Sequence, residues 1–196
     1  VGRLPWRGVL AVILASVAFG CAGRAGFTPT PAETRTVELM AQRLEVARDV
    51  AWIKFQNNAP VQDRQREAEL LASLVAQGTQ AGIPAPQVAA FFTAQIRASR
   101  QVQSGLIFGW RRGRALPASP PWDLRRDIRP QLDRISAELL QELAGGTARG
   151  GNAALADYAE RVIRARGFSC YVARIAADPL RRASRATNPA GTVAVP

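Results

Sequence analysis

Apolar residues recur every three or four positions along most of this chain, and the positions between them are mainly polar or charged. Val37, Met40, Ala41 and Leu44 illustrate this spacing, which places apolar side chains on one face of an α-helix. The strict alternation expected of strands is nearly absent. The pattern predicts helices at about residues 31–55, 61–80, 86–111, 124–143, 153–166 and 169–182. We therefore expect an all-α bundle of five to six helices.

The predicted helix boundaries come from capping residues, proline and glycine. Thr30 and Glu33 fit an N-terminal capping box, in which the two residues satisfy each other's backbone N–H groups. Pro130 is compatible with a helix only in the first turn or at a kink. The Asp178-Pro179 step is a candidate break in the last helix. The residues expected to form the core-facing stripe of the second helix are Leu70, Leu71, Leu74 and Val75.

The beginning of the chain has the pattern of an export signal. Arg3 and Arg7 precede an apolar stretch at 8–20, which is shorter than the ~20 residues that span a membrane, and small residues follow it. Lipidation of Cys21 and an uncleaved membrane anchor remain as alternatives. The predicted organisation is an export signal at 1–26, a helical domain at 27–185 and a disordered tail at 186–196.

Composition narrows the chemistry that such a bundle can carry. The chain has no histidine, which excludes serine–histidine triads, histidine general bases and most zinc sites. Its two cysteines, Cys21 and Cys170, are too few for a zinc cluster or a disulfide framework. If Cys21 is removed with the export signal, we expect Cys170 to be a free, buried thiol. The formal net charge of +11 favours anionic partners without distinguishing nucleic acid, a membrane surface and a small acidic metabolite.

Four groups of polar residues stand out along the predicted helices. Arg43 and Lys54 are 11 residues apart, about three turns, so they share a largely apolar face of the first helix and suggest an anion site. The other groups are Asp63, Arg66 and Glu67 on the second helix, Ser99 and Gln103 on the third, and Arg129 near the start of the fourth. Each group alone is also explained by a snorkelling cation, a surface charge ladder or a polar helix flank.

Together, the order and spacing of these groups closely resemble the all-helical chorismate mutases, and their exported subclass in particular. The matching blocks are residues 43–47 with Lys54, residues 63–67, residues 95–99 with Gln103, and residues 123–133. The resemblance spans about residues 34–143. It implies the type II mutase fold and the rearrangement of chorismate to prephenate in aromatic amino-acid biosynthesis. It also implies a periplasmic or secreted location.

The resemblance implies which residues bind the substrate: Arg43, Lys54, Asp63, Arg66, Glu67, Ser99, Gln103 and Arg129. Arg43 and Arg129 would hold the two carboxylates of chorismate. Lys54 and Gln103 would be the catalytic residues, because they would donate hydrogen bonds to the ether oxygen at the breaking C–O bond.

The other candidate residues would assist. Arg66 and Ser99 would support the carboxylates, and Asp63 and Glu67 would orient the ring hydroxyl. One chain would supply the whole site of a homodimer. Neither a metal nor another cofactor is needed, and nucleic acid is not expected as a partner. Stable membrane association is expected only if Cys21 is lipidated.

The chain departs from some relatives at three places. Gln103 stands where some exported members have a glutamate, so its donor does not depend on protonation. Cys170 has no second cysteine in the C-terminal half with which to form the disulfide of some exported members. Leu70 replaces a glutamine of some relatives. None of these changes removes a charge that the reaction needs.

Two alternatives remain open at this point. The first is a basic helical envelope protein that binds anionic polymers or lipids, with its arginines on solvent faces. It gives no reason for Lys54, Asp63, Glu67 and Gln103 to converge. The second is a degenerate mutase that binds chorismate without turning it over.

Overall fold

The computed structural model describes residues 27–117, 123–147 and 152–182, which form six α-helices and one π-helical turn without any strand. The elements are α1 (Pro31–Gln56), α2 (Arg64–Gln80), α3 (Ala85–Arg111), η1 (Leu124–Ile128), α4 (Arg129–Ala144), α5 (Ala153–Ala165) and α6 (Cys170–Arg182). The predicted all-α bundle is confirmed. The predicted signal segment, with Cys21, and the predicted tail at 186–196 lie outside the described residues.

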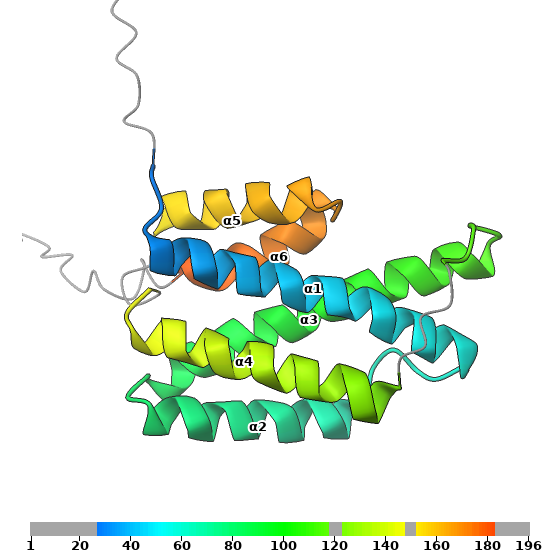
Figure 1. Ribbon diagram of the computed structural model, residues 1–196, viewed down its shortest axis with the longest axis horizontal. Coiled ribbons are helices and arrows are strands. Elements are labelled where there is room, and N and C mark those ends of the chain that lie inside the picture. Colours follow the sequence, from blue (N-terminus) through cyan, green and yellow to red (C-terminus); the bar gives the residue numbers. More distant parts are fainter. Residues whose placement is uncertain (1–26, 118–122, 148–151, 183–196) are drawn as a thin grey trace, which may run out of the picture.

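The two longest helices, α1 and α3, run through the middle of the bundle, and the other four flank them in two pairs (Figure 1). On one side, α2 packs on α3 and α4 packs on α1 and α2. On the other side, α5 and α6 pack on each other, α5 contacts α1, and α6 contacts α3. Fully buried side chains such as Leu39, Leu44, Phe91 and Phe92 fill the centre, each contributing about 1.5–3 kcal/mol by burial. None of the described helices combines the length and apolarity needed to cross a membrane.

Side-chain caps determine where two of the helices begin. Thr30 and Glu33 form the predicted capping box: Thr30 Oγ1 accepts from Glu33 N at 3.2 Å, and Glu33 Oε2 accepts from Thr30 N at 2.8 Å. α2 begins later than predicted, because Asp63 Oδ1 accepts from Arg66 N at 3.0 Å and caps the helix there. Pro130 lies in the first turn of α4, as predicted, directly after the π-helical turn η1.

Two predictions for the last helix are wrong. α6 continues through Pro179 instead of breaking there, because the proline lies close to the helix end and Ala177 and Leu180 anchor that end in the core. Cys170 is free, as predicted, but exposed instead of buried. It is the first residue of α6, and the buried face of that helix begins only at Val172.

The predicted core stripe of the second helix is only partly correct. Leu74 is buried, whereas Leu70, Leu71 and Val75 are half-buried. The reason is the position of α2 at the edge of the bundle, where it packs mainly on α3 and α4 and leaves one side open (Figure 1). Leu70 packs against the core and also lines the pocket described below.

Gly78 allows α2 to pack closely on α3. A Cβ atom at this position would lie 2.5 Å from Val88 Cγ2 and 3.1 Å from Leu140 Cδ2. Val88 is fully buried and β-branched, so a rotamer change cannot relieve the contact. We therefore expect Gly78→Ala to lower the free energy of unfolding by about 1–3 kcal/mol in urea denaturation. The matched control is Gly105→Ala in α3, where nothing lies within 4 Å of the new Cβ and stability should rise by about 0.5–1 kcal/mol. Equal stability of the Gly78→Ala and unmodified chains would contradict this account of the packing.

Candidate functional site

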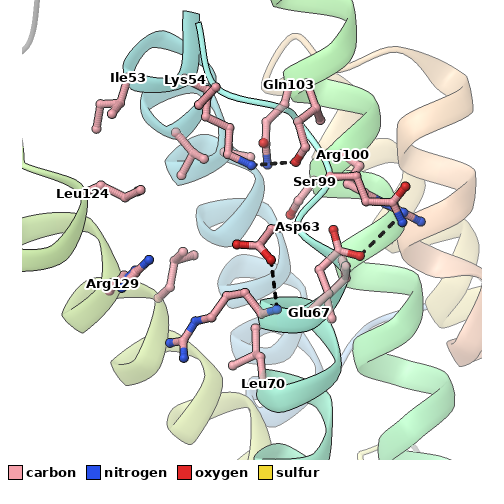
Figure 2. A pocket seen from close by; sticks show the side chains of 18 of the residues that line it. Ile53, Lys54, Asp63, Glu67, Leu70, Ser99, Arg100, Gln103, Leu124 and Arg129 are labelled. Atoms are coloured by element: carbon pink, nitrogen blue, oxygen red, sulfur yellow. Dashed lines mark hydrogen bonds and ion pairs between the residues drawn. The ribbon is translucent and has the colours of Figure 1, made fainter. Parts of the chain in front are cut away.

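A pocket of about 520 Å³ lies between α1, α2, α3 and the segment formed by η1 and α4 (Figure 2). All eight candidate residues line it: Arg43, Lys54, Asp63, Arg66, Glu67, Ser99, Gln103 and Arg129. They come from four separate stretches of the sequence. The packing of α1 and α3 against α2 and α4 is what brings these stretches together.

Arg43 is a buried cation at the α1 wall of the pocket. Its side chain is 3% exposed, and its Nη1 donates to Ser136 Oγ at 2.7 Å, while its Nε has no hydrogen-bond partner. Burial lowers the pKa of the Arg43 guanidinium to about 10, although the charge of Asp133 opposes this shift. Among the ion pairs of the described residues, none involves Arg43. A buried cation with a nitrogen that lacks a hydrogen-bond partner has the properties of an anion-binding group.

Lys54 lines the pocket from the last turn of α1. Its half-buried ammonium donates to the carbonyl oxygen of Val61 at 2.6 Å, because the chain after α1 folds back beside the helix. Burial lowers the pKa of Lys54, and the nearby carboxylates of Glu67 and Asp63 oppose the shift by favouring the charged form. Two of the three ammonium protons remain for other acceptors.

Two of the three carboxylates that line the pocket, Asp63 and Glu67, come from the N-cap and first turn of α2. Asp63 caps α2 through Oδ1, so its second oxygen remains available. Glu67 Oε2 lies 3.5 Å from Arg100 Nη1, in an ion pair between α2 and α3 (Figure 2). Arg66 lies at the rim, where its Nη1 is 3.8 Å from Glu69 Oε2 and its side chain is exposed to 46%. This exposure makes Arg66 the most loosely held of the α2 candidates.

The α3 and α4 residues complete the walls. Gln103 is 7% exposed, and its Oε1 is buried without a partner. Ser99 lies one turn before it on the same face of α3, which its spacing in the sequence predicts. Arg129 is half-buried at the first residue of α4 and reaches the pocket from the side opposite α3 (Figure 2).

Six polar residues that line the pocket were not among the sequence candidates: Asn57, Gln62, Arg64, Arg100, Asp133 and Ser136. Ser136 is 2% exposed and lies seven residues, about two turns, after Arg129, so it shares the same face of α4. Its position between the core residues Ile135 and Leu139 is the signal that could have identified it. Arg100 follows Ser99 directly, and only its contact with Glu67 distinguishes it from a surface arginine.

The arrangement suits a small anion that also has an apolar body. The basic residues lining the pocket are Arg43, Lys54, Arg64, Arg66, Arg100 and Arg129, and the acidic ones are Asp63, Glu67 and Asp133. Val50, Ile53 and Ile96 give it apolar walls. In the described part of the chain, no three Cys, Asp or Glu side chains gather closely enough to hold a metal ion. The pocket therefore offers positive charge and hydrogen-bond donors to a group that develops negative charge.

The chain is similar to chorismate mutases in sequence and in structure. A family model described as chorismate mutase type II matches residues 33–104. The crystal structure of chorismate mutase from Burkholderia phymatum matches with a TM-score of 0.67 and 31% identity, over 78% of this chain and 94% of that one. The corresponding structure from Burkholderia thailandensis has a TM-score of 0.63 and 32% identity, over 79% and 97% of the two chains. A secreted chorismate mutase of Yersinia pestis is 27% identical over 112 residues, covering 56% of this chain and 58% of that protein, little more than half its length.

Proposed function

This chain belongs to the chorismate mutase type II family, and we propose that it catalyses the rearrangement of chorismate to prephenate outside the cytoplasm. The observation that carries the proposal is the convergence of eight polar residues from four helices on one pocket. The rival interpretation, a basic envelope protein that binds polymers or lipids, finds no support among the relatives. It also does not explain why a buried arginine whose Nε has no hydrogen-bond partner lines a pocket.

The reaction is a unimolecular, pericyclic rearrangement that requires no nucleophile and no proton transfer. Chorismate is a dicarboxylate, and it must be held in a compact shape in which the two reacting carbons approach each other. Arg43 and Arg129 hold the carboxylates from α1 and α4, since the planar guanidinium forks bind carboxylates bidentately. Arg66 and Ser99 assist at the rim. Fixing the reactive conformer removes a large part of the entropic barrier.

Negative charge develops on the ether oxygen as its bond to carbon lengthens. Lys54 and Gln103 donate hydrogen bonds to this oxygen from α1 and α3. The bond from Lys54 to the Val61 carbonyl orients the ammonium, so its remaining protons are directed before the substrate reacts. Preorganised donors of this kind are typically worth about 3–4 kcal/mol each.

The ring hydroxyl of chorismate is oriented by the carboxylates of α2. Asp63 caps the helix through Oδ1, which leaves its second oxygen for the hydroxyl. Glu67 pairs with Arg100 through Oε2, which leaves its Oε1 for the hydroxyl. Both carboxylates also lie near Lys54 and favour its charged form. The same two residues therefore bind the substrate and maintain the cation that acts on it.

Export and assembly complete the proposal. The name of the Yersinia pestis relative describes it as secreted, which supports export of this chain. We assign export to the signal at 1–26 and place the enzyme in the periplasm or outside the cell. The exported subclass also implies a homodimer in which each chain carries its own complete pocket.

The experiment that tests the proposed function is a direct assay. Purified chain 27–196 is incubated with chorismate, and the loss of chorismate is followed by ultraviolet absorbance. Circular dichroism shows whether the protein is helical under the same conditions. Turnover well above the uncatalysed rate is expected, and absence of turnover by folded protein would contradict the proposal. Saturable binding without turnover would instead identify a degenerate mutase.

The pH dependence of kcat/KM follows from Gln103. A glutamine donates at any ordinary pH, so we expect a plateau from mildly acidic to mildly alkaline pH. Activity should fall at higher pH, because Lys54 loses its proton at a lower pH than free lysine and the pKa of Arg43 is about 10. In Gln103→Glu, the glutamate must be protonated to donate, so kcat/KM should fall as pH rises through the mildly acidic range. A steep loss across neutrality in the unmodified enzyme would contradict the role of Gln103.

A further inference from the structure

Arg43 is anchored by Ser136, a residue of α4 outside the eight candidates. Arg43 Nη1 donates to Ser136 Oγ at 2.7 Å, and Ser136 Oγ donates to the carbonyl oxygen of Leu132 at 2.7 Å. Ser136 and Arg43 are 2% and 3% exposed, so water does not compete for these bonds. A hydroxyl has one proton, so its donation to Leu132 leaves a lone pair for Arg43 and sets the direction of both bonds.

The other guanidinium nitrogens determine how an anion can bind Arg43. A guanidinium presents one pair of parallel N–H groups along Nε and Nη2 and another along Nη1 and Nη2. One of the two N–H groups of Nη1 donates to Ser136, whereas Nε is buried without a partner. A carboxylate along the Nε–Nη2 edge would therefore complete the hydrogen bonding of Arg43. A carboxylate across Nη1 and Nη2 would use the second N–H of Nη1 and would leave Nε without a partner.

We propose that Ser136 is a positioning residue, which holds the Nη1 corner of Arg43 so that the Nε–Nη2 edge receives one carboxylate of the substrate. This inference rests on the proposed function. Without Ser136, Arg43 would keep its charge but lose its fixed orientation, and ordering it during binding would weaken the complex. The substrate carries its carboxylates in both the ground state and the transition state. The effect therefore falls mainly on KM.

The test begins with Ser136→Ala, which removes the hydroxyl and keeps a good helix former in α4. We expect the KM for chorismate to rise about tenfold, with kcat within about twofold of the unmodified enzyme. The matched control is Ser104→Ala on α3, an exposed serine whose replacement should change neither constant. An unchanged KM in Ser136→Ala would overturn the inference.

A double-mutant cycle separates positioning from a general structural role. Lysine at position 43 keeps a charge but has no planar edge for Ser136 to orient. In the Arg43→Lys background, Ser136→Ala should therefore raise KM by less than about twofold. An equal rise in both backgrounds would show that Ser136 acts on the fold generally and would overturn the inference.

The proposed function and this inference can fail separately. Turnover by the unmodified chain with no effect of Ser136→Ala removes only the inference. If the unmodified chain does not turn over chorismate, the same cycle is measured by calorimetry as the Kd for chorismate. If Ser136→Ala raises the Kd for chorismate tenfold when Arg43 is present but not in the Arg43→Lys background, the positioning role is supported. Absence of chorismate binding by the unmodified chain overturns both.

Discussion

Lys54→Ala is expected to lower kcat about 10²–10³-fold, because it removes a preorganised cation from the oxygen on which negative charge develops. The measurement is the rate at saturating chorismate, with circular dichroism to show that the helices remain. KM should change less than kcat, because the charge that Lys54 stabilises is largest in the transition state. A kcat within threefold of the unmodified enzyme would remove Lys54 from the catalytic role.

Lys54→Arg is the sharper form of the same test. Of 26 basic residues in the chain, Lys54 is the single lysine, so a compact ammonium occurs only here. The larger, planar guanidinium cannot keep the bond to Val61 and place a proton at the same point, so kcat should still fall at least about tenfold. The matched control is Arg35→Lys, an exposed exchange on α1 where Arg35 pairs with Glu138. Near-normal kcat in Lys54→Arg would count against the proposed geometry.

Arg43→Met is expected to lower kcat/KM at least about 100-fold, because two charge-assisted hydrogen bonds to a substrate carboxylate are lost. The free energy of unfolding should not fall with the activity. Burial lowers the pKa of Arg43 to about 10, because removal of the guanidinium from water disfavours its charged form. Methionine fills similar space without a charge, so the free energy of unfolding should stay equal or rise by about 1–2 kcal/mol.

The two readouts of Arg43→Met separate binding from structure. Activity is measured as kcat/KM for chorismate, and stability by urea denaturation of the same preparation. Ser136 keeps its bond to the carbonyl of Leu132 in this variant, so no hydroxyl proton is left without an acceptor. A fall in stability of more than about 2 kcal/mol would indicate that Arg43 is a structural residue. Unchanged kcat/KM would place substrate binding elsewhere.

The sequence by itself determined the helices and the faces of the candidate residues. The capping box of Thr30 and Glu33 is visible in the sequence because its partners are three residues apart. The shared face of Arg43 and Lys54 follows from helix geometry once the helix is recognised. These features involve residues that are close together in the sequence. Because the hydrogen bonding of a helix is regular, the spacing of such residues in the sequence determines where they lie on the helix. The roles of the eight candidates came from the resemblance to a family and stay predictions.

Only the tertiary structure decided which faces meet and how deeply each is buried. The bond from Arg43 to Ser136 joins residues 93 positions apart, and no local pattern encodes it. Leu70 is half-buried, packs against the core and also lines the pocket, because α2 lies at the edge of the bundle. Cys170 is exposed because it is the first residue of α6 and precedes the buried residues of that helix, which begin at Val172. Each outcome depends on which helices pack together, and that choice is made by the whole set of apolar faces at once.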